Sequence, residues 1–416
     1  MAIRLKLSIK VQSSKERLHS LVEDYDLMIN RNSSWFRMLA VMLGTGLLTI
    51  GAFVGCSSEN AVTEKASSAA KPQTIEEKAD AIVAAMTTNE KIGQMVMIGV
   101  HGTDIDDDSK AMLRQFHIGG VIYFDRNIKS QMQLKAFSEH LQAYAQGEEA
   151  HQKVPLFIGI DEEGGIVSRG KGVIPVPESE QAIGASGKPE LAQASAVKTA
   201  QALKEVGINL NMAPVADVGS KDTRSFASDA NTVTLFTGKA ADGYEQEGMM
   251  YALKHFPGIG KGKVDSHKEV SRVDASKGIM EKEDLVPFAE MINTRRPENY
   301  MILVSHLIYP CYDPDHSASQ SSAVMTDLLR GKLGYKGIII TDDLEMGAVA
   351  NHVSMRRIGV NAVKAGADIV LVCHEYPHEE DVYMGLKDAV DAGEITEDRL
   401  NESVRRIVMA KLANKL

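Results

Sequence analysis

The sequence contains only three cysteines among its 416 residues, at Cys56, Cys311 and Cys373. Three thiols cannot build the disulfide framework of a small secreted domain or a structural zinc cluster, so both are excluded. A single bridge between Cys311 and Cys373 stays open as an alternative. We expect instead that these two residues are reduced thiols in the core or in loops.

Basic charge is also scarce. The formal net charge is −10, and because residues 1–37 contain seven Lys and Arg against four Asp and Glu, the remainder carries −13. Nucleic-acid binding needs a concentrated basic face, so we expect no nucleic-acid partner. Such an acidic surface suits a neutral substrate or a soluble glycan. The hydrophobic share of 44% is ordinary for a globular protein of one large or two small domains.

Residues 38–54 form a run of seventeen residues without a charge, with Arg31 and Arg37 before it and Cys56 after it. A basic region, an apolar core and a cysteine in this order resemble a bacterial lipoprotein signal, which predicts acylation of Cys56. The alternative is an uncleaved membrane anchor, for which seventeen residues are short. Translation from Met28 would give a signal of ordinary length. We therefore expect residues 1–56 to be an extension and signal, 57–74 a flexible tether, and the protein to be a membrane-anchored lipoprotein of the cell envelope with its catalytic part outside the cytoplasm.

Short apolar runs alternate with helical patterns from about Ile75 to the end. Continuous apolar runs, without polar alternation, are typical of strands covered on both faces of a parallel sheet. Eight strand–helix units predict a single (β/α)8 barrel over residues 75–416; a doubly wound open sheet is the alternative. The runs span residues 95–100, 119–124, 156–160, 208–215, 251–256, 301–306, 337–341 and 368–372.

Helix signals lie between these runs. Thr87 and Glu90 form a capping-box pattern. Gly366 follows an apolar face that ends at Ala365, and Thr396 precedes a final amphipathic stretch. These signals predict a helix start at each threonine and a helix end at the glycine.

Polar residues follow five of the predicted strands, at the end of a barrel where catalytic groups belong. Directly after an apolar strand, Asp342 is expected in the barrel mouth as a nucleophile or as a stabiliser of a cationic transition state. A helix N-cap or a buried, hydrogen-bonded carboxylate are the alternatives, and Asp343 is the more structural of the two neighbours. The other polar strand ends are Asp161, Asp217, Lys254 with His255, and His306.

A second candidate site is the segment 161–165, DEEGG, with Arg169 after it. Asp161 can accept hydrogen bonds from sugar hydroxyls, and Arg169 can clamp a polar group or orient Asp161. A tight acidic turn is the alternative.

The segment 254–267, KHFPGIGKGKVDSH, concentrates lysines, imidazoles and a carboxylate. Asp265 and His267 are separated by one residue, so in a tight loop the carboxylate can hold the ring. A histidine supported by an aspartate is suited to proton transfer near neutral pH. The glycines do not have the spacing of a phosphate-binding loop.

Taken together, DEEGG with Arg169, RSF at 224–226, KHFPG followed by DSH, SH after an apolar strand, and TDDLEM at 341–346 resemble glycoside hydrolase family 3, in particular its β-N-acetylglucosaminidase branch. The resemblance covers about residues 75–416. It implies a retaining, metal-independent hydrolase without a cofactor, acting on terminal β-linked N-acetylglucosamine of peptidoglycan- or chitin-derived oligosaccharides. It also implies Asp342 as nucleophile, His267 as acid/base with Asp265 as its partner, and the sugar-binding residues Asp161, Arg169, Arg224, Lys254 and His255. We expect a monomer.

The departures from the family pattern are local. Ile259 stands where the family usually has His or Arg, Lys261 where it has an acidic residue, and Ala227 where it usually has Gly. These positions bear on substrate contacts and on the loop, and none removes a proposed catalytic group. A β-glucosidase or a phosphorylase of the same family remains an alternative activity, and a non-catalytic glycan-binding lipoprotein is the alternative from another functional class.

Overall fold

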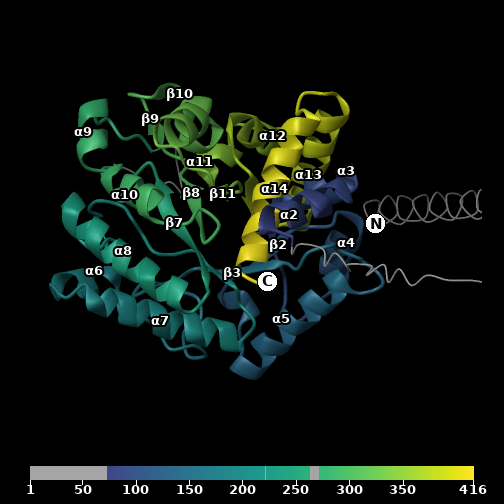
Figure 1. The fold of residues 1–416 in the computed structure, drawn as a ribbon, viewed down its shortest axis with the longest axis horizontal. Helices are drawn as coiled ribbons and strands as arrows, with labels where there is room; N and C mark the ends of the chain where they lie inside the picture. Colours follow the sequence, from purple (N-terminus) through teal and green to yellow (C-terminus); the bar gives the residue numbers. More distant parts are fainter. Residues whose placement is uncertain (1–72, 221, 263–270) are drawn as a thin grey trace, which may run out of the picture. The chain divides into compact units, whose positions relative to one another are not determined.

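The computed structural model describes residues 73–220, 222–262 and 271–416, which belong to one compact unit, Lys71–Leu416. Its centre is a closed barrel of eight parallel strands in the order β1-β12-β11-β8-β7-β6-β3-β2 (Figure 1). Because β1 pairs with β12, with Val96 opposite Val370, the sheet has no open edge and the open-sheet alternative is wrong. The barrel strands are β1 (Val96–Gly99), β2 (Gly120–Tyr123), β3 (Phe157–Ile160), β6 (Leu210–Asn211), β7 (Met250–Phe256), β8 (Tyr300–Val304), β11 (Ile338–Asp343) and β12 (Ile369–Val372).

The strands are buried almost throughout, as continuous apolar runs require. One run was predicted too long. The pattern at 208–215 gives only the two-residue strand β6, after which the chain contacts β7 through an isolated bridge between Val215 and Lys254. Pro214 has no N–H to donate, so the hydrogen-bond ladder cannot continue through it.

Helices surround the barrel, and three sequence signals are confirmed. Thr87 caps α3 with a complete capping box, Gly366 ends α12 with a positive φ of 131°, and Thr396 caps α14. The α-helices are α2 (Ile75–Ala84), α3 (Thr88–Gln94), α4 (Asp107–Gln115), α5 (Gln131–Gln146), α6 (Glu180–Ala185), α7 (Glu190–Glu205), α8 (Ala230–Gln246), α9 (Lys277–Lys282), α10 (Val286–Thr294), α11 (Gly347–Ala350), α12 (Met355–Ala365), α13 (Tyr376–Asp391) and α14 (Glu397–Ala413). A π-helix spans Ala323–Lys332.

Two small antiparallel hairpins were not predicted. The strands β4 (Glu162–Gly164) and β5 (Val167–Ser168) follow β3 directly, and β9 (Ile308–Tyr309) pairs with β10 (Asp313–Ser317) after β8. Both follow the carboxyl end of a barrel strand, so they stand at the end where the candidate site residues gather.

The opposite end of the barrel is closed by buried charges. Asp368, which is fully buried just before β12, binds Arg330 and Arg406. The buried Lys411 of α14 donates to the Gly119 carbonyl before β2 and to Gln94. In Figure 1, α14 lies beside α2 and α3, which it contacts. The last helix is therefore bound to the first helices of the unit and to the residues just before β2 and β12.

Cys311 and Cys373 are both free, so the disulfide alternative is wrong. Among the residues described, no helix is both long and apolar enough to cross a membrane. The predicted signal, with Cys56, lies outside the described residues.

Candidate active site

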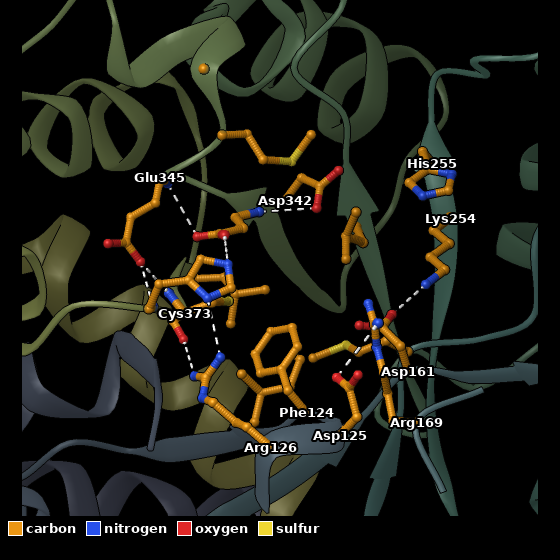
Figure 2. Close-up of a pocket in the computed structure, with 18 residues that line it drawn as sticks. Phe124, Asp125, Arg126, Asp161, Arg169, Lys254, His255, Asp342, Glu345 and Cys373 are labelled. Carbon is orange, nitrogen blue, oxygen red and sulfur yellow. Dashed lines mark hydrogen bonds and ion pairs between the residues drawn. The ribbon is translucent and has the colours of Figure 1, made fainter. Parts of the chain in front are cut away.

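A pocket of about 840 Å³ opens at the carboxyl ends of the barrel strands (Figure 2). A smaller hollow of about 140 Å³ shares six of its lining residues and extends it toward Arg224 and Ile259. The main pocket is lined by Ile122, Phe124, Asp125, Arg126, Asp161, Arg169, Met212, Lys254, His255, Leu303, Asp342, Asp343, Glu345, Met346, Gly347, Leu371, Cys373 and His374. Four of the five predicted sugar-binding residues line it together with Asp342, and the fifth, Arg224, lines the smaller hollow.

Asp342 stands near the end of β11 with its side chain partly exposed to both hollows. Its Oδ1 accepts the Asp343 N–H at 2.9 Å. Burial alone would raise the pKa of Asp342, but the neighbouring His306, the Asp343 N–H and Lys254 outweigh burial and the pKa is lowered. The carboxylate is therefore ionised at neutral pH and open to a ligand. It caps no helix, so the N-cap alternative is wrong.

Lys254 connects two carboxylates beside Asp342. Its Nζ lies 2.6 Å from Asp161 Oδ1 and 2.6 Å from Glu163 Oε1. Burial lowers the pKa of Lys254, yet the two carboxylates outweigh it and the pKa is raised. Despite its own burial, Glu163 has a pKa of about 2, because Lys254 and Arg224 stabilise its charged form. Lys254 and Glu163 therefore stay charged at neutral pH, and Asp161 faces the pocket.

His255 is held by a buried acid and an arginine. Its Nδ1 lies 2.8 Å from Asp217 Oδ2, and its Nε2 lies 3.2 Å from Nη2 of Arg224. Since a guanidinium can only donate, Nε2 accepts and the ring proton is on Nδ1, donated to Asp217. Arg224 also donates twice to Glu163, at 2.8 Å each. One continuous polar network thus runs from Asp161 to Asp217.

Arg169 does not orient Asp161, which was one of its two predicted roles. Its ion-pair partner among the described residues is Asp125, at 4.0 Å, and its guanidinium lies 5.4 Å from the Phe124 ring centre. Lys254 is the residue that holds Asp161 (Figure 2). Nε of Arg169 is buried without a hydrogen-bond partner in the described part of the chain. Arg169 lines the pocket, so its other predicted role, clamping a polar group there, stays a prediction.

The proposed acid/base His267 and its partner Asp265 lie outside the described residues, as does Cys56. Their assignments stay predictions from the resemblance. The loop is described up to Gly262, and Ile259 lines the smaller hollow.

Sequence reasoning missed Glu163 and underrated Asp217. Glu163 lies in the acidic segment after β3, where the sequence predicted a site role only for Asp161. Asp217 was noted as a polar strand end, but nothing in the sequence showed that His255 would be its partner. His306, another polar strand end, is buried and donates from Nε2 to the Asp343 carbonyl at 2.7 Å while contacting Ser319, so it supports the end of β11.

The residues on the other side of the pocket were also missed. Glu345 Oε2 accepts the backbone N–H of Cys373 at 2.9 Å, which fixes the end of β12 against β11. Asp343 contacts the His374 ring, and this hydrogen bond raises the pKa of His374. Figure 2 shows Glu345, Cys373 and Arg126 as one group, apart from Asp161, Lys254 and His255. Asp343 therefore has the structural role expected for it: it holds the ring of His374, which lines the pocket.

Residues 87–410 match the family model for the N-terminal domain of glycosyl hydrolase family 3. A relative named beta-hexosaminidase A from Pseudoalteromonas piscicida is 31% identical over 381 residues, covering 80% of this chain and 62% of the relative. A beta-hexosaminidase from Alkalilimnicola ehrlichii is 32% identical over 319 residues, covering 73% of this chain and 87% of the relative. The chain therefore spans less than two thirds of the first relative and most of the second.

Solved structures agree with the sequence comparison. A glycoside hydrolase family 3 β-N-acetylglucosaminidase from a Paenibacillus species matches with a TM-score of 0.76 and 35% identity, over 79% of this chain and 63% of that one. A β-N-acetylhexosaminidase from Beutenbergia cavernae matches with a TM-score of 0.73 and 27% identity, over 78% and 98%.

Proposed function

The chain belongs to glycosyl hydrolase family 3, and on that premise we propose that it is a β-N-acetylhexosaminidase, a retaining exo-glycosidase for terminal, non-reducing β-linked N-acetylglucosamine. One observation carries the proposal: Asp342, ionised and open to the pocket, stands beside the polar network of Asp161, Lys254 and Glu163. The names of the relatives support the same activity.

The network is suited to hold one sugar. Asp161 accepts from sugar hydroxyls, while Arg169 and Arg224 donate to sugar oxygens. Because Lys254 and Glu163 are almost fully buried, they keep Asp161 and Arg224 in place without facing solvent themselves. A site whose polar groups are fixed before the sugar enters loses little free energy in ordering them.

The proposed mechanism has two displacement steps. Asp342 attacks the anomeric carbon, and the bond to the leaving oxygen breaks as His267 gives that oxygen a proton. A covalent glycosyl-enzyme results. His267 then takes a proton from water, whose oxygen attacks the anomeric carbon and releases Asp342 as a carboxylate. A histidine acid suits a site that already holds an ionised aspartate, because an imidazolium is attracted to it where a second carboxylate would be repelled.

The first test concerns Asp342. Asp342→Ala should lower kcat on an aryl N-acetyl-β-glucosaminide by several orders of magnitude, because the covalent step has no nucleophile. With a slow 5-fluoro glycosyl substrate, intact-protein mass spectrometry should find one sugar added to the wild type and none added to Asp342→Ala. A variant that keeps substantial activity, or a sugar attached to another residue, would place the nucleophile elsewhere.

The substrate is proposed to be a peptidoglycan- or chitin-derived oligosaccharide, met by a monomer that is anchored at the cell envelope through Cys56. The acidic net charge and the lipoprotein-like signal support this proposal. Mass-spectrometric analysis of the products from muropeptides and chito-oligosaccharides, with and without phosphate, separates the two glycans and separates hydrolysis from phosphorolysis.

A further inference from the structure

Glu180, the first residue of α6, is a buried acid that has no part in the two displacement steps. Its two carboxyl oxygens lie 3.0 and 3.2 Å from the backbone nitrogen of Val215, whose N–H they accept. Burying a carboxyl group costs free energy that one hydrogen bond only partly offsets, so the position of this side chain calls for a reason.

Val215 needs this partner because of where its neighbouring strands lie. On either side of it in the chain, the Pro214 carbonyl accepts the Lys254 N–H at 3.3 Å, and the Ala216 N–H donates to the Lys254 carbonyl at 2.6 Å. Since alternate residues of a strand bond to opposite neighbours, the Val215 N–H points away from β7. On that other side, β3 has already ended. The Glu180 carboxyl therefore replaces a strand carbonyl and fixes the backbone that pairs with Lys254.

The same helix fixes the segment that carries Arg224. The Gln181 N–H donates to the Thr223 carbonyl at 3.2 Å. Gly184 lies so close to the Phe226 backbone that a Cβ on this glycine would be 1.8 Å from the Phe226 carbonyl oxygen. The helix α6 therefore supports both cations of the polar network, the lysine on one side and the arginine on the other.

Glu180 carries no charge at neutral pH. Burial and the nearby Glu163 raise the pKa of Glu180 well above its usual value, although the two cations of the network oppose this shift. Burial also raises the pKa of Glu162 and of Tyr244, which share a cavity of about 20 Å³ with Glu180. As a neutral acid, Glu180 accepts from Val215 without competing with Glu163 for the cations. The titratable groups that face it are Glu162 and Glu163 of β4, Tyr244 of α8, Lys254 of β7, and Arg224.

We propose that Glu180 is a positioning residue for sugar binding, a neutral acid that holds the backbone beside Lys254 and so keeps this lysine and Arg224 in place for the sugar. The proposal rests on the proposed function, because it concerns the sugar that this network holds. Glu180 is not among the described residues that line the pocket or the smaller hollow, so it acts through the network without touching the sugar. Its loss should therefore weaken sugar binding more than it slows attack by Asp342.

Two variants separate the hydrogen bond from the charge. Glu180→Ala removes the acceptor of the Val215 N–H, so the Kd of N-acetylglucosamine, from calorimetric titration, should rise about five- to twentyfold. Glu180→Gln keeps a neutral acceptor of the same length, and its Kd should stay within about twofold of wild type. On an aryl N-acetyl-β-glucosaminide, Glu180→Ala should raise KM by a larger factor than it lowers kcat, because Asp342 is held by β11.

Glu379→Ala is the matched control, because Glu379 is also a buried acid in the first turn of a helix, α13, and is not among the described residues that line either hollow. It should leave the Kd of N-acetylglucosamine unchanged. Circular dichroism confirms that each variant is folded. Glu180→Met fills the same space without an acceptor and carries the same expectation, should the alanine variant not fold. An unchanged Kd in these variants, or a Glu180→Gln variant that binds as weakly as they do, would overturn the positioning role.

The charge of Glu180 can be read without turnover. The infrared difference spectrum between wild type and Glu180→Gln at neutral pH should contain the carbonyl band of a protonated carboxyl group, and carboxylate bands in its place would overturn the neutral state. A wild-type protein that neither binds N-acetylglucosamine nor cleaves its glycosides overturns the proposed function, and the role of Glu180 in sugar binding with it. A wild-type protein that binds the sugar no better than Glu180→Ala overturns the role of Glu180 alone.

Discussion

Glu379 on α13 is a buried acid that the proposed chemistry does not use. Its side chain is fully buried, and neither carboxylate oxygen has a hydrogen-bond partner in the described part of the protein. Burial and the nearby Glu345 raise the pKa of Glu379 from 4.5 to about 9. The folded protein therefore holds this carboxyl protonated at neutral pH, whereas the unfolded chain releases the proton.

This difference predicts a pH-dependent stability. The folded-state pKa lies above the unfolded one, so between about pH 4.5 and 9 the folded state binds a proton that the unfolded state has lost, and stability falls as pH rises. Glu379→Gln removes the titration. Its free energy of unfolding, from urea titrations at pH 5, 6.5 and 8, should rise relative to wild type by up to roughly 1.4 kcal/mol per pH unit. Parallel curves for the two proteins would mean that Glu379 is not protonated in the fold.

At the scale of elements, the segment that leaves β7 is fixed on both sides. The Ile259 N–H donates to Asp217 Oδ1 at 2.8 Å, and Nζ of Lys261 lies 2.6 Å from Asp284 Oδ2. Gly258 has a φ of 121°, and a Cβ on Gly260 would lie 2.2 Å from the Val218 carbonyl oxygen. Lys261, which replaces a usual acidic residue of the family, thus has an acid as its partner here. The same Asp217 holds both His255, a proposed sugar-binding residue, and this segment, so the two share one anchor.

His267 follows this segment in the sequence, and its proposed acid/base role can be tested with substrates that differ in their leaving groups. His267→Ala should lower kcat/KM on N,N′-diacetylchitobiose by about 10²–10⁴ because its alkoxide leaving group needs a proton. On a 2,4-dinitrophenyl glycoside, whose leaving group needs none, the cleavage step should be almost unaffected. Azide, which replaces water without needing a base, should speed release of the covalent intermediate in the variant. Equal losses on the two substrates would remove His267 from the acid/base role.

At the scale of the whole molecule, the barrel could be predicted because the eight apolar runs and the helix signals between them follow local rules. Asp342 could be placed for the same reason, since a residue directly after a buried strand has one position in a barrel. The pairing of Lys254 with Glu163, and of His255 with Asp217, could not be predicted. Each joins residues 38 to 91 positions apart, and spacing carries no information about such contacts. The family resemblance supplied the roles of Asp265 and His267, which the structure does not describe.

The proposed envelope location also concerns the whole chain. If Cys56 is acylated, the protein expressed in a bacterium should take up an alkyne-labelled fatty acid and fractionate with membranes. Cys56→Ser should abolish the label and move the protein to the soluble fraction, while activity on a soluble glycoside is kept. An unlabelled wild-type protein, or a variant that stays with the membranes, would contradict lipid anchoring through Cys56.

Because β1 pairs with β12, the barrel can close only late in the synthesis of the chain. Val96 emerges from the ribosome long before its partner Val370, so the edge of β1 stays unpaired while most of the chain is synthesised. No shorter nascent chain can close the barrel, and α14, which covers its base, comes later still. Because an open strand edge can pair with other chains, a stop codon anywhere before β12 should give an aggregation-prone fragment, not a smaller working enzyme.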